Sequence, residues 1–267
     1  FVENLDHTQM FKNLMHLCEN PDLGFYFVDD VYTDDHTYRT FSYRLVGSYN
    51  MWLLPDALNC RGTMFRKNKT TNGWDLVCLP MPKCFRLGEN PIIMEQQKTF
   101  DKLSLFTKHD GSLISTFIDA NGNLGAKSKT SLKSPHAKLA KQYISNALVE
   151  LVERYNNIPG YLDLWDLKNN TISFELTSED PDLRIVLKYE ETKLQPLNVR
   201  SMGDGKVRSF NQLRWCVPTV DSLIKHCETE TGVEGYIVHD SHNDVYFKIK
   251  TGWYDTLHSS KFNFSEE

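Results

Sequence analysis

The sequence lacks a long apolar run, and no segment approaches the roughly 18 apolar residues that a membrane-spanning helix needs. It also lacks the basic and then apolar start of a secretory signal, and it lacks an initiator methionine. These absences predict a cytoplasmic protein without a membrane partner. They also predict that the chain is a processed or trimmed form.

Cysteine is sparse, and none of the cysteines forms a C-x-x-C pair. The six are Cys18, Cys60, Cys78, Cys84, Cys216 and Cys227. A zinc site is therefore not expected, and a chain of 267 residues needs no disulfide framework. Cys60 stands beside Arg61 without any His-containing partner set, so we interpret it as a small buried hydrophobe.

Positive charge is not in excess, because the formal net charge is −5, which argues against indiscriminate coating of nucleic acid. The charge is unevenly distributed. Residues 98–141 contain eight lysines and three aspartates. This basic zone indicates either a local anionic ligand or a solvated face, and at this point both interpretations stay open.

Internal repeats and the βαβα alternation of a doubly wound fold are both absent. Short strand-like segments separated by polar turns fill the region from Phe25 to about Leu105. One helix is expected over residues 9–18, a second from the N-cap Ser134 and Pro135 to Tyr155, and a third near residues 220–228. Further strands are expected at residues 170–176, 184–189, 195–200, 233–240 and 244–250. This mixture predicts an α+β fold dominated by antiparallel strands.

Two dipeptides predict β-hairpin turns. Asn121-Gly122 lies between strand-like segments, and Asp110-Gly111 follows "LSLFTKH" and precedes "SLISTF". The second turn leaves two interpretations of Lys108. It is either a solvated lysine beside the turn or a nucleophile held at the end of a strand.

The order of several charged residues along the chain favours the nucleophile. Taken singly, each is more often a surface residue than a catalytic one. Together they follow the order of the motifs shared by ATP-dependent ligases and mRNA capping enzymes, the covalent nucleotidyltransferases. The ordered set is Lys108-x-Asp110-Gly111, Lys129, Phe174-Glu175, Glu234-Gly235 and Lys248-Ile-Lys250.

The sequence around these motifs is more specific for one family than the motifs themselves. Segments such as "PDALNCRG", "TKHDGSLISTFID", "KSKTSLKS", "RIVLKY" and "YFKIKTGWYDTLHSSK" resemble the RNA ligase 1 family of T-even bacteriophages, from about Met10 to Lys261. The resemblance implies an antiparallel-sheet nucleotidyltransferase domain with flanking helices over residues 1–267. Its β-rich N-terminal segment would be residues 1–100. It also implies that the helical C-terminal domain of that family, associated with tRNA specificity, is absent.

The resemblance implies a reaction in three steps. Lys108 attacks the α-phosphorus of ATP and becomes lysyl-AMP, the AMP passes to an RNA 5′-phosphate, and an RNA 3′-hydroxyl displaces it. The expected partners are ATP and RNA ends, including those of cleaved tRNA, in RNA repair by a monomer in the host-cell cytoplasm.

The resemblance also assigns roles to residues. Lys248 and Lys250 act on the α-phosphate, and Asp110 orients Lys108 or a metal-bound water. Glu234 is expected to hold Mg²⁺ or Mn²⁺, and Glu175 to bind the ribose or metal water. The other expected nucleotide contacts are Tyr43, Arg61, Lys83, Phe85, Gly111 and Lys129. Lys108 has to lose its proton to attack, since a free lysine has a pKa of about 10.4, and neighbouring cations favour the neutral amine.

Other functions remain as alternatives. A DNA ligase or a capping guanylyltransferase uses the same motifs, and a non-catalytic module that binds RNA ends would keep the basic residues. His239 and His242 lack the spacing and the partners of a metal site. The five tryptophans, Trp52, Trp74, Trp165, Trp215 and Trp253, are interpreted as core or rim residues rather than base-stacking platforms.

Overall fold

The computed structural model describes residues 3–89, 91, 95, 99–100, 102–161, 163–180, 191–215, 217 and 219–263. The chain divides into two compact units, each assembled from three segments. Unit 1 comprises Phe1–Lys83, Ser112–Leu176 and Lys193–Arg208, and unit 2 comprises Cys84–Gly111, Thr177–Thr192 and Ser209–Glu267. The expectation that residues 1–267 act as one nucleotidyltransferase domain stays a prediction.

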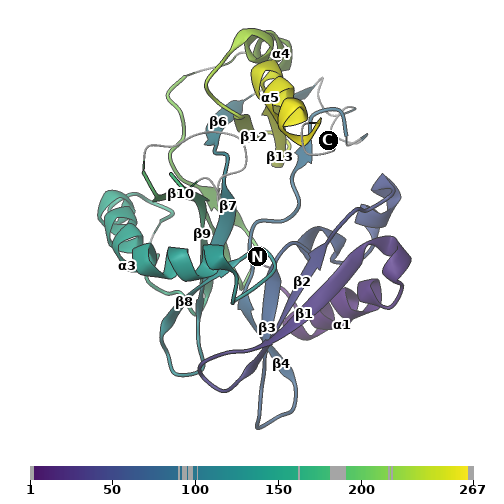
Figure 1. The fold of residues 1–267 in the computed structure, drawn as a ribbon, viewed down its shortest axis with the longest axis vertical. Coiled ribbons are helices and arrows are strands. Elements are labelled where there is room, and N and C mark those ends of the chain that lie inside the picture. Colours follow the sequence, from purple (N-terminus) through teal and green to yellow (C-terminus); the bar gives the residue numbers. More distant parts are fainter. Residues whose placement is uncertain are drawn as a thin grey trace. The chain divides into compact units, whose positions relative to one another are not determined.

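Unit 1 begins with a helix and an antiparallel four-stranded sheet. The elements are α1 (His7–Cys18), β1 (Phe25–Val31), β2 (Thr37–Tyr43), β3 (Thr63–Lys67) and β4 (Trp74–Cys78), and the strand order is β1-β2-β3-β4. Helix α1 packs across this sheet (Figure 1). Its Phe11 contacts the rings of Phe41, Phe65 and Trp74. Three short 3-10 turns, η1 (Pro21–Leu23), η2 (Tyr49–Leu53) and η3 (Ala57–Asn59), complete this part.

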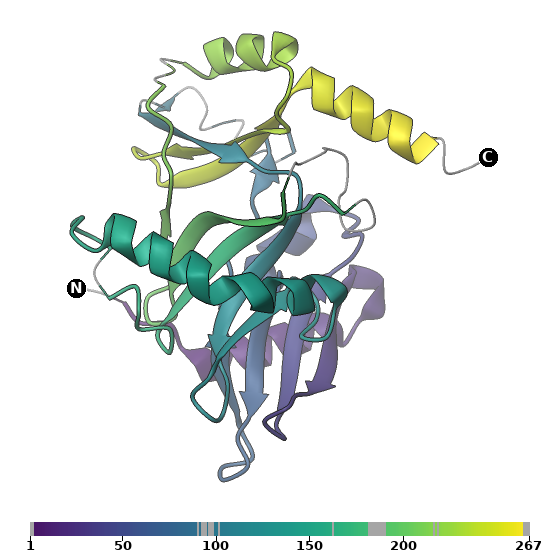
Figure 2. The same ribbon diagram turned by 60° about the vertical axis from the view of Figure 1, so that its left-hand side comes forward.

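A second sheet of unit 1 has the order β11-β10-β9-β7-β8. Its strands are β7 (Ser112–Ile118), β8 (Leu124–Ser128), β9 (Asn170–Thr177), β10 (Lys193–Ser201) and β11 (Val207–Ser209). Helix α3 (Pro135–Tyr155) covers one face of the sheet, as Figure 2 shows. A core cluster joins the two sheets of unit 1 and contains Tyr38, Met64, Val77, Cys78, Phe117 and Leu132.

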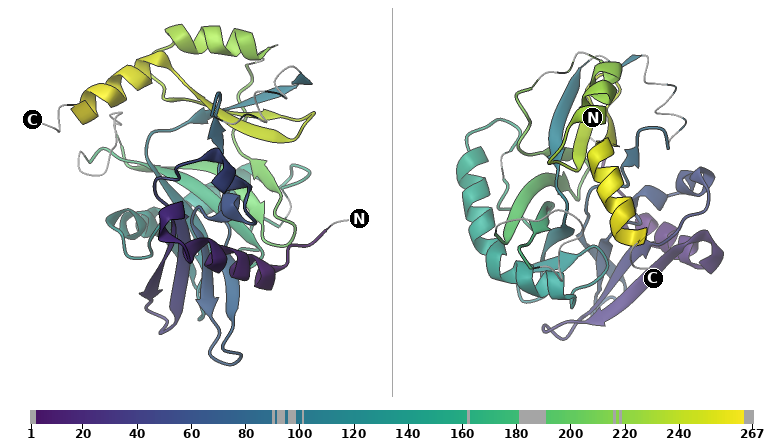
Figure 3. Two further views of the ribbon diagram at one scale, coloured as in Figure 1. Left: turned by 90° about the vertical axis from the view of Figure 1, so that its right-hand side faces the viewer. Right: turned by 45° about the horizontal axis from the view of Figure 1, so that its top comes forward.

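Unit 2 contains a smaller sheet with the order β5-β13-β12-β6. Its strands are β5 (Phe85–Arg86), β6 (Leu103–Lys108), β12 (Gly235–Asp240) and β13 (Val245–Lys250). The helices α4 (Val220–Thr229) and α5 (Gly252–Asn263) contact each other, and α4 packs on β13 (Figure 3).

The predicted helices and the antiparallel α+β architecture are confirmed. Ser134 caps α3, because its hydroxyl accepts from the Ala137 amide, and the apolar residues on one side of that helix are buried, namely Ala140, Ile144, Leu148, Leu151 and Tyr155. Helix α5 was not predicted, although Thr251 before it and Asp255 in its first turn are helix-start signals. The predicted strand at residues 184–189 lies outside the described residues.

One of the two predicted hairpins is wrong. Asn121-Gly122 does join the antiparallel neighbours β7 and β8, with Gly122 at φ +82°. Asp110-Gly111 does not close a hairpin, because β6 pairs with β12 while β7 pairs with β8 and β9. The dipeptide instead connects a sheet of unit 2 to a sheet of unit 1. A local turn signal carries no information on which strands pair.

The expectation that Cys60 is a small buried hydrophobe agrees with the structure. Cys18, Cys60, Cys78 and Cys227 form no disulfide, and Cys60 is fully buried with its thiol donating to the Ser42 carbonyl; Cys216 lies outside the described part of the chain. His239 contacts Asp244. In the described residues, no helix is long and apolar enough to cross a membrane.

The core of unit 1 contains one ammonium group. Lys127 on β8 is 0 % exposed, and its Nζ donates to the carbonyls of Gly62 at 2.8 Å and Ser128 at 2.7 Å. Burial lowers the pKa of Lys127 to about 8, against the opposing influence of Cys78 and Asp30. Burial in the core therefore disfavours the charged form of Lys127.

This pKa predicts a pH effect on stability. The folded pKa lies below the unfolded value of about 10.4, so the unfolded chain binds more protons between these two pH values. The stability of the wild type relative to Lys127→Met should therefore rise with pH from about 8 to about 10.4, by up to roughly 3 kcal/mol. Urea unfolding of both proteins across this range measures the difference, and a difference independent of pH would contradict the prediction.

Candidate functional site

Three strands of unit 2 place two of the predicted lysines in one row. Gly235, the first residue of β12, pairs with Lys108 of β6 on one side and with Lys250 of β13 on the other. Residues directly opposite each other in a sheet point to the same face. Lys108 and Lys250 therefore share a face on either side of a residue that has no side chain, and Lys248 lies on that face two residues along β13.

Gly235 is required by the backbone itself. A Cβ atom at this position would lie 2.0 Å from the Ile249 carbonyl oxygen and 2.8 Å from the Lys250 Cα. Only glycine allows β12 and β13 to approach this closely. At Gly235 it is therefore the protein's own neighbouring strand that approaches the backbone closely.

Glu234 contacts the predicted nucleophile. Its Oε2 lies 2.6 Å from Lys108 Nζ, and the two side chains are 6 % and 23 % exposed. The backbone of Glu234 is fixed as well, because its carbonyl accepts from the Thr251 amide at 2.9 Å. The ion pair thus joins Lys108, at the end of β6, to Glu234, whose backbone is hydrogen-bonded to Thr251 just before α5.

Asp110 is held by a residue that the sequence prediction missed. It is 2 % exposed, and its Oδ1 accepts from the Tyr254 hydroxyl at 3.0 Å. Tyr254 lies in the first turn of α5, and its amide donates to the Thr251 hydroxyl. Burial raises the pKa of Tyr254, and Glu234 and Asp110 raise it further, so the phenol keeps its proton. The sequence signal for Tyr254 was its position four residues after Lys250 and three after Thr251, which caps α5.

Lys250 occupies an electrostatically crowded position. Its Nζ lies 5.6 Å from the centre of the Tyr254 ring. Burial lowers the pKa of Lys250, as do the charges of Lys108 and Arg86, while Glu234 and Asp255 oppose the shift. Arg86 in turn forms a two-pronged ion pair with Asp255 of α5.

Unit 1 gathers a second group of predicted residues around an aromatic ring. Lys129 Nζ lies 4.2 Å and Lys83 Nζ 5.3 Å from the centre of the Tyr43 ring, whose edge packs on Trp52. Arg61 lies close enough to influence the phenol, and its guanidinium donates to the Met81 carbonyl. We call Tyr43, Arg61, Lys83 and Lys129 the cation cluster.

The charges of this cluster act on one another. Burial alone would raise the pKa of Tyr43, but Lys129, Lys83 and Arg61 together bring it below its ordinary value. Burial lowers the pKa of Lys129, and the positive charges of Arg61 and Lys83 add to the effect. Three cations confined around one partly buried ring form a site that favours an anion.

For three further predicted residues, Glu175, Phe85 and Gly111, we describe only the position in the fold. Glu175 lies in β9 opposite Leu113, two residues from the Ser173–Ser115 pair and on the face that carries Lys127. Phe85 is buried and pairs with Phe247. Gly111 ends the unit 2 segment that contains Lys108. Their nucleotide-binding roles stay predictions.

No cluster of three or more His, Cys, Asp or Glu side chains able to hold a metal ion occurs in the described parts of the chain. This is compatible with Mg²⁺, which commonly takes one or two protein carboxylates and completes its shell with water and substrate phosphate oxygens. Glu234 fits this mode, since its nearly buried carboxylate has a cation, Lys108, as its partner.

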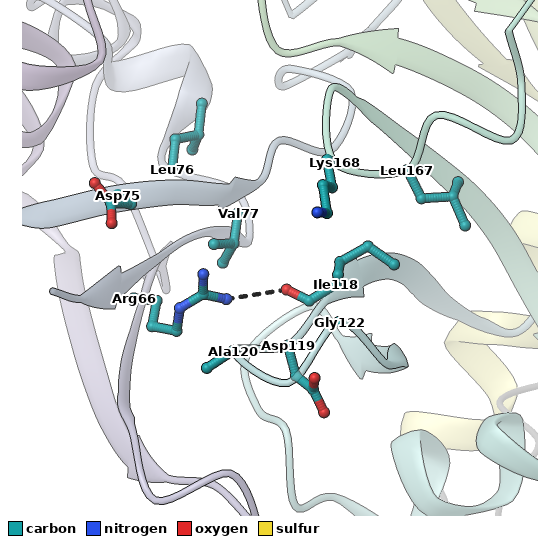
Figure 4. A pocket seen from close by; sticks show the side chains of 10 residues that line it. All are labelled: Arg66, Asp75, Leu76, Val77, Ile118, Asp119, Ala120, Gly122, Leu167 and Lys168. Atoms are coloured by element: carbon teal, nitrogen blue, oxygen red, sulfur yellow. Dashed lines mark hydrogen bonds between the residues drawn. The ribbon is translucent and has the colours of Figure 1, made fainter.

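Each unit also contains a cavity. In unit 1 a cavity of about 280 Å³ lies between β4 and the β7–β8 turn, where Arg66 donates to the Ile118 carbonyl (Figure 4). It contains none of the predicted site residues. In unit 2 a cavity of about 450 Å³ is lined by Lys250, by the Arg86–Asp255 pair and by apolar residues of α4 and β13.

The known proteins that this chain resembles are RNA ligases. A family model described as RNA ligase matches residues 59–214. RNA ligase 1 of bacteriophage TS2126 is 29 % identical over an alignment of 231 residues, and the match covers 78 % of this chain and 54 % of that protein. The chain thus spans about half the length of this curated relative.

Two solved structures, forms 1 and 2 of an archaeal ATP-dependent RNA ligase, resemble the chain in fold. They align with 90 % and 85 % of this chain and with 61 % and 59 % of their own, at TM-scores of 0.54 and 0.51. Their sequence identities are 12 % and 14 %, so this likeness concerns the fold alone. It agrees with the predicted antiparallel-sheet nucleotidyltransferase architecture.

The Tyr254 hydroxyl should contribute measurably to stability. In Tyr254→Phe the buried Asp110 carboxylate loses the hydrogen bond from the Tyr254 hydroxyl, which should cost about 1.5–3 kcal/mol of unfolding free energy in urea denaturation. Tyr143→Phe, at a half-exposed position of α3, is the matched control and should change stability by less than about 0.5 kcal/mol. Equal effects of both substitutions would show that the hydrogen bond to Asp110 contributes nothing.

Gly235→Ala should separate β12 from β13. The new methyl group has no room beside the Ile249 carbonyl, so the strands have to move and the thermal midpoint should fall by several degrees. Gly47→Ala is the control, because a Cβ atom added at Gly47 would have no other atom within 4 Å. The interpretation is wrong if both variants melt at the wild-type temperature.

Proposed function

We propose, starting from the fact that this chain belongs to the RNA ligase family, that it is the nucleotide-transferring part of an ATP-dependent RNA ligase. It joins a 5′-phosphate end of RNA to a 3′-hydroxyl end through lysyl-AMP and RNA-adenylate intermediates. The ion pair between Lys108 and Glu234, in one row with Lys250, is the observation that carries this proposal.

The first step is a substitution at the α-phosphorus of ATP. Lys108 first gives up a proton, and the freed lone pair of Nζ then forms a bond to phosphorus. The bond between the α-phosphorus and the bridging oxygen breaks, and that oxygen leaves with pyrophosphate. The product is a phosphoramidate between Lys108 and AMP, and electrons and atoms balance without a further reactant.

The neighbours of Lys108 suit this step. Glu234 contacts the amine at 2.6 Å and is placed to accept its proton or to hold the amine in line. Lys250, in the same row, is placed to neutralise the charge that builds up on the α-phosphate oxygens. Asp110, fixed by Tyr254, anchors the chain two residues after the nucleophile.

Glu234 would hold a divalent ion, Mg²⁺ or Mn²⁺, which would supply positive charge for the phosphate oxygens. A cation held by Glu234 would also favour the neutral, nucleophilic amine of Lys108 over its ammonium form.

The cation cluster supplies phosphate and ribose contacts. Arg61, Lys83 and Lys129 bring three positive charges to one partly buried surface, and Tyr43 and Trp52 form its aromatic wall. Glu175 is assigned to the ribose or to metal-bound water, and Phe85, Gly111 and Lys248 to the nucleotide, on the motif match alone. The natural substrate is proposed to be cleaved tRNA, sealed in RNA repair by a monomer in the cytoplasm of a phage host.

Covalent labelling tests the proposal. With Mg²⁺ and ATP labelled at the α-phosphate, the wild type should acquire label through an acid-labile, alkali-stable bond. Lys108→Ala should acquire none, because the nucleophile is absent. Lys102→Ala, at an exposed position just before β6, is the control and should label like the wild type.

The same assay separates the alternatives. Labelling by GTP rather than ATP would indicate a capping guanylyltransferase, and sealing of DNA ends in preference to RNA ends a DNA ligase. Binding of RNA ends without pyrophosphate release would indicate a non-catalytic module. An unlabelled wild type, or a Lys108→Ala variant that labels equally well, would overturn the proposal.

A further inference from the structure

We propose that Lys127 is a positioning residue, whose buried ammonium fixes Arg61 and Lys129 at a set distance from each other. The inference rests on the proposed function only where it says that these two cations contact ATP. The spacing itself is a property of unit 1 and is testable without any reaction.

Lys127 donates hydrogen bonds to two backbone carbonyls. One belongs to Gly62, the residue after Arg61, and the other to Ser128, the residue before Lys129. A single ammonium thus ties together two chain segments that are distant in sequence, each within one residue of a cation of the cluster. Lys127 itself touches neither cation through its hydrogen bonds, so it acts through the backbone.

Gly62 is held from several sides. Its amide donates to the Phe41 carbonyl at 2.8 Å, and its own carbonyl accepts from Lys127. Its φ is +95°, and a Cβ atom would lie 3.0 Å from the Lys129 carbonyl oxygen and 3.4 Å from Lys127 Nζ. The Arg61–Gly62 backbone is therefore packed directly against the segment that carries Lys129, and only glycine fits there without strain.

The segment that carries Lys129 is fixed on its other side. The Ser128 amide donates to the Ser131 carbonyl, and the Ser134 hydroxyl, which caps α3, lies 2.9 Å from the Ser128 hydroxyl. Movement of Ser128 would have to break this serine network as well as the bond to Lys127. The ammonium completes a set of bonds that leaves Lys129 little freedom in its backbone.

A second buried cation braces the rest of the cluster in the same way. The Arg200 guanidinium donates to the Asn59 side chain and to the Pro80 carbonyl, each at 2.8 Å. The Lys83 amide donates to the Leu58 carbonyl, and Arg61 donates to the Met81 carbonyl. The segments bearing Arg61 and Lys83 are thus joined to each other, and Lys127 adds the third segment, which bears Lys129.

Stability alone does not account for a lysine at this position. A fully buried ammonium has a large desolvation cost, and an apolar side chain of similar volume is often neutral or stabilising in its place. Lys127 nevertheless occupies this position, with its Nζ donating to two carbonyls. The benefit that offsets the cost is the fixed spacing of the cations beside it.

The first test uses Tyr43 as a reporter. The positive charges of Arg61, Lys83 and Lys129 lower the pKa of Tyr43. NMR titration of protein labelled at the tyrosine Cζ, with the Tyr43 signal identified in Tyr43→Phe, measures it. In Lys127→Met that pKa should move upward, because the cations are no longer held near the ring. Leu14→Ala, which removes buried methyl groups from α1, lowers stability elsewhere and should leave it unchanged.

The second test separates binding from chemistry. Lys127→Met should raise the KM for ATP in lysyl-AMP formation at least tenfold and change the rate at saturating ATP less than threefold. In an Arg61→Ala background the same substitution should add much less, because one of its two targets is already gone. Lys127→Arg, which keeps a buried cation with several donors, should recover part of the affinity.

The outcomes are distinguishable. If the wild type forms no lysyl-AMP, the proposed function fails, while the Tyr43 titration still decides the inference. If the wild type is labelled but Lys127→Met keeps both the Tyr43 pKa and the KM within twofold of wild type, Lys127 is not a positioning residue. Equal KM increases in Lys127→Met and Leu14→Ala would reduce its role to general stability and also overturn the inference.

Discussion

The register of β12 against its two neighbours decides where Lys108, Glu234 and Lys250 lie in unit 2. Gly235 fixes it, because any side chain there would collide with the Ile249 carbonyl. With Gly235 opposite both lysines, Glu234 comes next to Lys108 and Lys250 lies across the row. A slip of one residue would turn every side chain of β12 to the other face of the sheet. Gly235 would then no longer lie between Lys108 and Lys250.

The cations described at the two candidate sites are held by different kinds of partner. In unit 2, opposite charges pair directly, as Lys108 does with Glu234 and Arg86 with Asp255. In unit 1, the buried cations Lys127 and Arg200 donate to backbone carbonyls and to one amide side chain. Carbonyl oxygens stabilise a cation without cancelling its charge. A region whose cations are bound by carbonyls therefore stays positively charged and attracts an anion. In a region of ion pairs the charges largely cancel, and the pairs mainly fix the positions of the side chains.

Local signals in the sequence predicted local structure well. The Ser134 cap, the apolar spacing of α3 and the Asn121-Gly122 turn each depend on neighbours within a few residues, and all three were confirmed. The motif order also led to Lys108, Glu234 and Lys250, which the sheet of unit 2 brings together. Asp110-Gly111 failed as a hairpin because strand pairing is decided by partners far along the chain. Tyr254 and Lys127 were missed for the same reason, since their importance comes from contacts with Asp110 and with Gly62 and Ser128.

The place of β6 in its sheet has a consequence for biosynthesis. β6 is an edge strand whose one pairing partner in the described sheet is β12, a strand that is synthesised long after it. At translation rates of about 5–20 residues per second, Lys108 waits several seconds or more before Glu234 and Gly235 exist. Throughout that interval the edge of β6 is available to wrong partners. The row of Lys108, Gly235 and Lys250 therefore forms only after the whole stretch between β6 and β13 has been synthesised.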